Sequence, residues 1–485
     1  MADYDTPLSE AQDLARAGRY EDAERACRRA LQLAPSDAAA LCALGAILIE
    51  LDRWDQAIVY LQRAVKAGAE SGPLSAANDA VTHLRRATET LPDNAGLFEL
   101  AASLEDLDRL DEAIPYLHAG LKADPEDGGI YRRLALAYRT AGAFEQAVYY
   151  ENRAAEVEPT AATYHSLAVD QLRLGRYVEG WRNYEQRPLA SMLATLCGVP
   201  KWNGLPLNGR TLLVYADGGL GDTIQFARFL PMVVERARGM VIFQCQAELI
   251  DLFGDMPGIA KIVPRPEAPA LPQDPVNCYI NLLSVPGLFG TDDETIPSPI
   301  LRIRVDDEAS ARWRERIAGL AGLKVGLRWA GNPNFPSDRN RSMHLKMFSP
   351  LAAVKGLSLV SLQLGLRAGE VHTEQHGLDI LSAPDDLASF GKTAALIGNL
   401  DLIISTCTSV PHLAGAMGVE TWLLLPFVPH WCWNVHRPMD TPWYPRHRLF
   451  RQPRPRDWGA VIDRVAGELS ARIALRGDSA AASGA

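Results

Sequence analysis

The chain has 485 residues, of which 47% are hydrophobic and 22% are charged, and its formal net charge is −10 at pH 7. This length allows two to four domains, and the acidic balance argues against a nucleic-acid-binding protein. No uncharged run reaches the roughly 20 residues of a membrane span, and residues 1–6 lack the basic and then apolar order of a signal peptide. The seven cysteines stand singly, which favours reduced thiols in a cytoplasmic protein over a disulfide framework or a zinc site.

Residues 1–187 carry a sequence pattern that recurs about every 34 residues. Small residues stand at fixed places in it, and proline closes several of the copies. The clearest copy, residues 128–161, contains Tyr138, Gly142 and Ala147. Small residues let paired helices cross closely, and proline ends the second helix of a pair. The pattern resembles the tetratricopeptide repeat, which has two helices per unit.

Residues 71–92 interrupt this period, and residues 75–91 indicate one helix without a full partner. The array as a whole predicts a right-handed superhelix with a concave groove. Arrays of this kind commonly hold a peptide or helix of a partner protein, and a packing or dimerisation surface is the alternative. The final helix, residues 177–187, carries Trp181 and Tyr184 and is expected to dock on the next domain.

A glycine-rich turn follows the connector of residues 188–209. The apolar run 210–215 predicts a buried parallel strand, and a helical pattern begins near Ile224. Between them lies Asp-Gly-Gly-Leu-Gly-Asp, residues 217–222, which matches neither the dinucleotide motif nor the phosphate-binding P-loop. The turn stands at the carboxyl end of a strand, where open α/β sheets bind ligands. Asp222 is therefore either a helix cap or a chemical group of a site.

Two lobes with alternating strands and helices fill the rest of the chain, the first over residues 210–300 and the second over residues 301–476. Strands are predicted over residues 240–245, 259–263, 277–281, 324–329, 357–362, 402–405 and 421–425. Helices are predicted over residues 247–253, 306–320 and 458–473, and a disordered tail over residues 477–485. Thr408 or Ser409 caps a further helix, whose N-terminal N–H groups face anions.

Five motifs occur in a fixed order through these lobes. They are Gly-Leu-Gly-Asp-Thr-Ile-Gln-Phe at 219–226, Trp-Ala-Gly-Asn-Pro at 329–333, Asp-Arg-Asn-Arg-Ser at 338–342, His-Leu-Ala-Gly-Ala at 412–416 and Pro-Trp-Tyr-Pro at 442–445. Together they resemble the GT-B glycosyltransferases related to the bacterial heptosyltransferases, in particular their relatives with an N-terminal tetratricopeptide array. The resemblance covers nearly the whole chain. It implies an α plus α/β fold, in which an α-solenoid precedes a two-lobed GT-B domain of twin Rossmann-like lobes.

The resemblance also implies roles for individual residues. Asp222 maps to the base that acts on the acceptor, and Gln225 lies on the acceptor side. An arginine of the 338–342 stretch maps to the group that holds the donor diphosphate, although a solvated loop is the alternative. The donor-binding set is Gly219, Gly221, Arg339, Arg341, Ser342, Gln363, Thr408, Ser409 and His412. Of these, Gln363 equally suits a role away from the nucleotide, and His412 suits either a neutral hydrogen-bond donor or a packed residue.

One position departs from the pattern of the heptosyltransferases. Many of these enzymes have an aspartate before the threonine, where it reaches hydroxyls of the donor sugar, and this chain has Cys407. A thiol cannot accept two hydrogen bonds from a diol as a carboxylate does, so heptose is disfavoured as the donor sugar.

The predicted activity is an inverting glycosyl transfer from a nucleotide sugar to a protein hydroxyl, with flagellin as one candidate acceptor, recruited by the array. No D-x-D motif stands near a strand end, and arginine can replace the charge of a metal, so we expect neither metal nor cofactor. The sugar stays open between hexose, heptose and nonulosonic acid. The alternatives are an acceptor that is a surface polysaccharide or lipid intermediate, and a non-catalytic scaffold.

Two further segments are rich in aromatic residues and in arginines, respectively. The residues His430, Trp431 and Trp433 either line the cleft between the lobes or pack under it. The arginines at 446, 448, 451, 454 and 456 are expected to form a solvated stretch.

Overall fold

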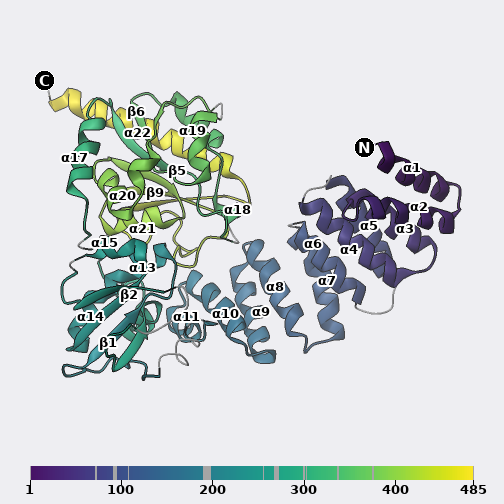
Figure 1. The fold of residues 1–485 in the computed structure, drawn as a ribbon, viewed down its shortest axis with the longest axis horizontal. Coiled ribbons are helices and arrows are strands. Elements are labelled where there is room, and N and C mark those ends of the chain that lie inside the picture. Colours follow the sequence, from purple (N-terminus) through teal and green to yellow (C-terminus); the bar gives the residue numbers. More distant parts are fainter. Residues whose placement is uncertain are drawn as a thin grey trace. The chain divides into compact units, whose positions relative to one another are not determined.

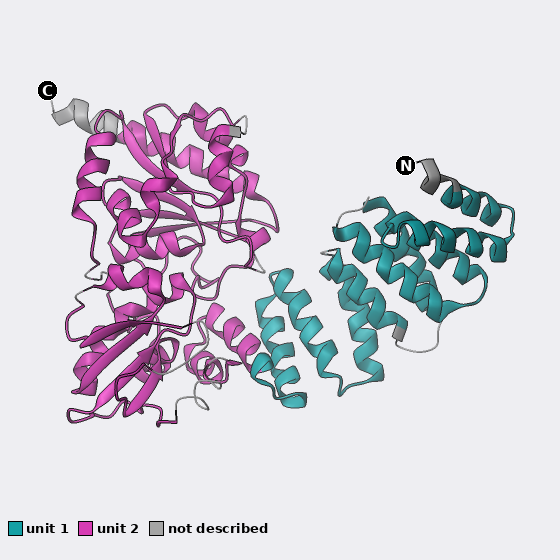
Figure 2. Ribbon diagram, viewed as in Figure 1, with its two compact units in different colours: residues 1–163 teal, residues 164–485 magenta. Residues whose placement is uncertain are grey.

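The computed structural model describes residues 2–70, 74–90, 95–107, 109–188, 190, 198–254, 256–266, 272–298, 301, 303–335, 338–373 and 376–483. The chain divides into two compact units, residues 1–163 and residues 164–485 (Figure 2). Each unit is described by itself. The division falls ahead of residue 187, the predicted end of the array, because the last helix pair packs with the α/β lobes.

The described part of the first unit is built of helices (Figure 1). They are α1 Ala2–Arg16, α2 Tyr20–Leu33, α3 Ala38–Glu50, α4 Trp54–Glu70, α5 Leu74–Thr90, α6 Ala95–Asp106, α7 Leu110–Ala123, α8 Gly128–Thr140 and α9 Phe144–Val157. Helix α5 is the single helix that was expected between complete pairs. Residues 71–73 and 91–94, at its two ends, lie outside the described residues.

The repeated small residues of the first unit are buried where paired helices meet. Ala23, Ala57, Ala113 and Ala147 occupy equivalent places in successive pairs, and none is exposed to solvent. Capping residues stand at the start of some of these helices. At the start of α8, for example, the Asp127 carboxylate accepts a hydrogen bond from Gly129 N at 2.7 Å. The helix-pair prediction is therefore confirmed for this unit.

The second unit begins with the last helix pair and a small parallel sheet. The pair is α10 Ala161–Arg173 and α11 Tyr177–Tyr184. The strands are β1 Thr211–Tyr215, β2 Met240–Cys245, β3 Lys261–Pro264 and β4 Cys278–Asn281, in the order β3-β2-β1-β4. The helices of this lobe are α13 Leu220–Phe226, α14 Leu230–Ala237, α15 Ile250–Phe253 and α16 Val285–Phe289.

A second parallel sheet follows in the order β10-β9-β8-β5-β6-β7. Its strands are β5 Leu323–Arg328, β6 Leu357–Ser361, β7 Ile380–Leu381, β8 Leu402–Thr406, β9 Thr421–Leu425 and β10 His447–Arg451. The helices of this lobe are α17 Asp307–Arg316, α18 Asp338–Arg341, α19 Glu370–Thr373, α20 Phe390–Ile397, α21 Ser409–Ala416 and α22 Trp458–Ser483. Counted from β5, this is the doubly wound order 3-2-1-4-5-6. The predicted fold class, a helical array followed by two Rossmann-like lobes, is confirmed.

Within the second unit, helix α11 packs against the α/β lobes, as predicted. The indole of Trp181 donates to Thr291 O at 2.8 Å and meets the ring of Trp431 edge-on, with ring centroids 5.5 Å apart. The hydroxyl of Tyr177 donates to the Asp293 carboxylate at 2.5 Å. The connector continues this packing where it is described, since Trp202 N donates to Tyr279 O at 2.7 Å beside β4.

Three expectations are corrected. The arginine-rich stretch contains strand β10, in which Arg448 pairs with Glu468 and Arg451 donates to the carbonyls of buried turns, so this stretch is not simply solvated. The short strand β7 and helix α20 were not predicted. Helix α22 continues to Ser483 through most of the expected disordered tail, because its alanine-rich end favours helix. Among the described residues, no helix combines the length and apolarity needed to cross a membrane.

Candidate functional site

The two predicted half-sites lie at equivalent places in the two sheets. In the first lobe, β1 pairs with β2 on one side and β4 on the other, and the glycine-rich turn leaves its carboxyl end. In the second lobe, β5 pairs with β6 and β8, and α21 starts just after β8. The strand order reverses at β1 and at β5, and such switch points are where open α/β sheets bind ligands.

Helices α13 and α21, one from each switch point, pack directly against each other. A Cβ atom on Gly221 would lie 3.0 Å from Cδ2 of His412 and 3.5 Å from Cα of Ser409. The glycine at 221 therefore serves the contact between the lobes, and its assignment as a donor-binding residue stays a prediction. Sequence alone could not separate these roles, because both require a position without a side chain.

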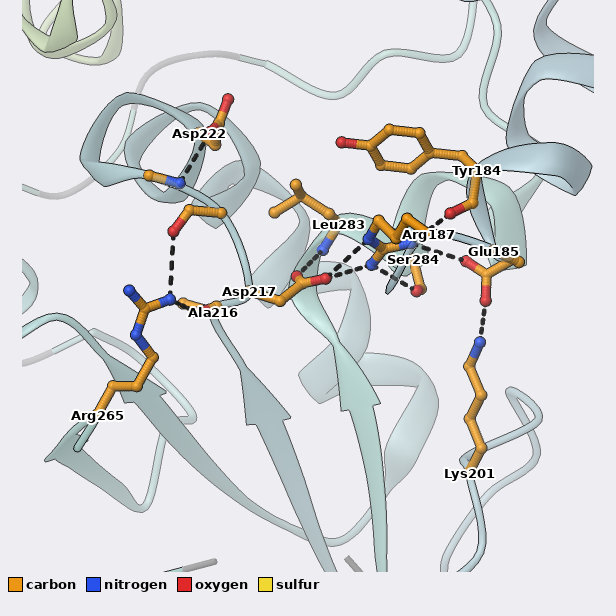
Figure 3. A network of polar contacts seen from close by, with 12 residues as sticks. Tyr184, Glu185, Arg187, Lys201, Ala216, Asp217, Asp222, Arg265, Leu283 and Ser284 are labelled. Atoms are coloured by element: carbon orange, nitrogen blue, oxygen red, sulfur yellow. Dashed lines mark hydrogen bonds and ion pairs between the residues drawn. The ribbon is translucent and has the colours of Figure 1, made fainter. Parts of the chain in front are cut away.

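Asp222 stands in the first turn of α13 with its carboxylate half-buried (Figure 3). Its Oδ2 accepts from Gly219 N at 2.9 Å, so the side chain caps its own helix. The cap uses one carboxylate oxygen, and no described hydrogen bond occupies Oδ1. The two interpretations of Asp222 are thus compatible, since one oxygen can hold the turn while the other accepts a proton. Gly219 contributes the capped N–H group to this arrangement.

Arg341 points toward the start of α21. Its Nη1 donates to Cys407 O at 2.9 Å and its Nε donates to the Asp338 carboxylate at 3.0 Å. Gly331 makes room for this pair, because a Cβ atom there would lie 2.5 Å from Oδ1 of Asp338. The structure therefore brings Arg341 together with Thr408, which caps α21 by accepting from Val410 N at 3.3 Å. Arg339, by contrast, is exposed.

Arg328, at the end of β5, is a neighbouring cation that sequence reasoning missed. Its guanidinium donates to Ala330 O at 3.0 Å and to Leu362 O at 2.8 Å. Burial lowers the pKa of Arg328 to about 10, and the charge of Arg341 adds to this effect. Two arginines that repel each other at a switch point form a site suited to an anion. An arginine directly after a buried strand was the available signal.

Two predicted contact residues are engaged inside the protein. Gln363 Oε1 accepts from Trp329 N at 3.2 Å and from Ala330 N at 2.9 Å, and Nε2 donates to Leu364 O at 2.9 Å. Its amide thus fixes the end of β5, and its contact with the nucleotide stays a prediction. Gln225 is fully buried, and its place on the acceptor side stays a prediction. It is buried because α13 is covered on every side from Thr223 onward.

Ser342 is a positioning residue in this arrangement. Its hydroxyl accepts from Gly331 N and donates to the Asp338 carboxylate, both at 2.8 Å. It holds the turn after β5 against α18. The structure therefore gives Ser342 a role in placing Arg341, whose own carboxylate partner is the same Asp338.

His412 is buried among aromatic residues. Its Nδ1 lies 3.0 Å from the Tyr444 hydroxyl, and its ring stacks on Trp433 with centroids 5.5 Å apart. Burial lowers the pKa of this imidazole well below its ordinary value, and nearby histidines and arginines act in the same direction. His412 is therefore neutral at pH 7, and the packed interpretation fits its contacts.

Cys407 is buried, and its sulfur accepts from Trp433 Nε1 at 3.1 Å. The side chain thus faces the protein interior while its carbonyl holds Arg341. Burial distinguishes the two interpretations of residues 430–433, which either line the cleft between the lobes or pack under it. Trp431 and Trp433 pack beneath the surface, whereas His430 is exposed with its Nδ1 3.2 Å from the Cys432 sulfur. Within the described part of the chain, no cluster of three or more metal-ligating side chains is present.

Comparisons with known proteins bear on both units. Tetratricopeptide-repeat family models match residues 14–77 and 98–162, which confirms the repeat prediction. Protein FlbA of Caulobacter vibrioides is 27% identical over 442 residues, or 78% of this chain and 73% of that protein.

Two solved structures are similar over about half of the chain. A glycosyl transferase family 9 protein from Veillonella parvula is 14% identical and matches 52% of this chain and 88% of its own, with a TM-score of 0.40. The E. coli ADP-heptose LPS heptosyltransferase II is 12% identical and matches 53% of this chain and 99% of its own, with a TM-score of 0.36.

Proposed function

We propose that this protein is an inverting, metal-independent glycosyltransferase that moves a sugar from a nucleotide-sugar donor to a protein hydroxyl. The second lobe holds the donor phosphates, and the glycine-rich turn of the first lobe presents the base. The repeat array recruits the acceptor, for which flagellin is a candidate. The observation that carries the proposal is the presence of a carboxylate, Asp222, at one switch point and of two arginines, Arg328 and Arg341, at the other.

The arginines suit the leaving group of such a transfer. A departing nucleoside diphosphate gains negative charge as the glycosidic bond breaks, and fixed cations stabilise that charge. Arg341 is oriented by Asp338 and by the carbonyl of Cys407, so its guanidinium needs little reorganisation to bind phosphate. Thr408 places the N-terminal N–H groups of α21 beside it.

Asp222 is suited to take the proton from the acceptor hydroxyl. The hydroxyl oxygen attacks the anomeric carbon, the bond to the diphosphate oxygen breaks, and the hydroxyl proton passes to the Asp222 carboxylate. The hydrogen bond from Gly219 N to Oδ2 orients the carboxylate for this transfer. In this scheme one attack on the anomeric carbon inverts its configuration.

Cys407 bears on the identity of the sugar. A thiol stands here in place of a carboxylate, and its sulfur is engaged by the indole of Trp433. This position therefore offers no carboxylate to sugar hydroxyls. We propose that the donor is a sugar other than heptose, with a nonulosonic acid carried on cytidine monophosphate among the candidates.

The test is a calorimetric screen of nucleotide sugars, followed by a transfer assay with the best ligand. We expect one donor to bind, its affinity to fall in Arg341→Ala, and sugar to appear on a protein acceptor. A donor that binds and is never turned over indicates the non-catalytic scaffold, which Cys407 favours. Transfer to a glycan or lipid in place of a protein contradicts the proposed acceptor, and the absence of any donor binding contradicts the function.

A further inference from the structure

A buried ion pair lies directly behind the glycine-rich turn. Arg187 follows helix α11, and Asp217 ends the segment that leaves β1. Nε of Arg187 donates to Asp217 Oδ2 at 2.9 Å, and its Nη2 donates to the same oxygen (Figure 3). The two residues are only 5% and 8% exposed. The helix that was predicted to end the repeat array is therefore joined to the turn that carries Asp222.

The remaining polar atoms of this pair link a third segment. Nη2 of Arg187 also donates to Ser284 Oγ at 3.0 Å, and Asp217 Oδ1 accepts from Leu283 N at 3.1 Å. Nη1 donates to Tyr184 O at 2.9 Å, which fixes the end of α11. The network thus ties α11, the end of β1 and the turn after β4 at one point.

A buried ion pair is weak evidence for stability, because removing two charges from water costs as much as their attraction returns. Its value here lies in placement, since Asp217 immediately precedes Gly218 and Gly219. Glycine leaves the backbone free to adopt many conformations, so such a turn needs external anchors. Gln246 and Arg265 provide two of them by donating to Gly218 O at 2.8 and 3.2 Å, and Arg187 provides another through Asp217.

We propose that Arg187 is a positioning residue of the active site, which acts through Asp217 to hold the glycine-rich turn and so to orient Asp222. The inference rests on the proposed function and deepens it. Helix α11, which was predicted to end the repeat array, then forms part of the catalytic unit.

The test compares Arg187→Gln, Asp217→Asn and the double variant in the full-length protein. Arg187→Lys keeps the charge and serves if the glutamine variant fails to fold. The matched control is Arg472→Gln, which removes the half-buried ion pair between Arg472, on α22, and Glu420, just before β9. The readouts are kcat, donor affinity by calorimetry, thermal melting, and hydrogen exchange of the amides of residues 218–222.

We expect each single variant to lower kcat on the order of 10-fold or more, because small misplacement of a catalytic group is costly. Donor affinity should stay within about twofold of wild type. The double variant should lose no more than a single variant, since both changes break one pathway. The amides of residues 218–222 should exchange faster in these variants, and their exchange rates should be unchanged in Arg472→Gln.

Wild-type kcat in both Arg187 variants overturns the inference, as does a double variant whose loss is the product of the single losses. If the wild-type protein turns over no nucleotide sugar, the proposed function fails, and hydrogen exchange alone then decides whether Arg187 holds the turn. Unchanged exchange at residues 218–222 overturns the inference in that case too.

Discussion

Asp222 combines two tasks in one side chain. Its Oδ2 caps α13 through Gly219 N, and the same contact fixes the direction of the carboxylate. Asparagine keeps an acceptor oxygen for the cap and cannot take up a proton at neutral pH. The cap and the chemistry can therefore be separated by one substitution.

Asp222→Asn should lower kcat by roughly 100-fold or more, the usual scale for loss of a general base, and should melt close to wild type. The control is Asp306→Asn, since Asp306 caps α17 by accepting from Ala309 N at 2.8 Å. That variant should be fully active. A fully active Asp222→Asn would leave Asp222 as a helix cap alone.

Arg341 and Arg339 form a natural pair for comparison, because they lie on the same short helix and differ in exposure. Arg341 is held by Asp338 and the carbonyl of Cys407, whereas Arg339 is exposed. Arg341→Ala should weaken donor binding by about 2–3 kcal/mol, the size of a lost charge-assisted hydrogen bond. Arg339→Ala should change it by less than about 0.5 kcal/mol. Calorimetry that shows equal affinities for both variants would remove Arg341 from the donor site.

At the scale of elements, the clearest repeat unit is the best place to test recruitment. It contains Arg132, Arg139 and Asn152, three polar residues that sequence alone offers as surface positions. The structure excludes Arg139, whose Nη2 donates at 2.7 Å to Glu151, a carboxylate that is 2% exposed. Removing Arg139 would strand a buried charge and destabilise the helix pair.

Tyr149 is chosen as the third position to be changed, in place of Arg139. Its side chain is 59% exposed, and tyrosine is enriched among the residues that dominate binding energy at interfaces. The triple change Arg132→Ala, Tyr149→Ala and Asn152→Ala should lower modification of the protein acceptor by about 10-fold or more. Donor affinity and melting should match wild type. Arg16→Ala on α1, which removes an exposed ion pair with Asp13, is the control. Full modification by the triple variant would move the docking surface to another unit of the array.

At the scale of the molecule, buried neutral histidines make stability depend on pH. His447 donates from Nε2 to Pro411 O at 3.0 Å and stacks on Tyr444. Burial lowers the pKa of His447 from 6.5 to about 3. Between pH 7.5 and 5.5 the folded chain therefore keeps this ring neutral while the unfolded chain takes up a proton. Stability is present above the unfolded pKa and falls as pH falls through it.

His447→Gln keeps a donor near the position of Nε2 and does not titrate. Between pH 7.5 and 5.5, wild type should lose about 1.4 kcal/mol more of its unfolding free energy than this variant does. Urea denaturation followed by tryptophan fluorescence reports on the second unit, since every tryptophan except Trp54 lies there. Other groups titrate equally in both proteins and cancel. Equal losses would show that His447 is protonated in the folded state.

Much of the architecture follows from local sequence. The buried alanines of the array, the capping aspartates and the apolar runs of β1, β2, β8 and β9 act within a few residues of themselves. Helix pairs and parallel strands were predicted from these patterns nearly within their observed bounds. The glycine-rich turn with Asp222 and the start of α21 were likewise evident, because turn chemistry at a strand end is a short-range property.

The tertiary structure decided which side chains these elements bring together. Gln363 and Gln225 look like site residues along the chain, yet neighbouring segments bury both. Arg187 and Asp217 are separated by the whole connector, and no local pattern marks them as an ion pair. Burial and charge pairing depend on the segments that pack around a residue, whereas periodicity and capping depend only on its neighbours in sequence. The sequence therefore determined the elements and the places of the two half-sites, and packing alone determined the contacts within them.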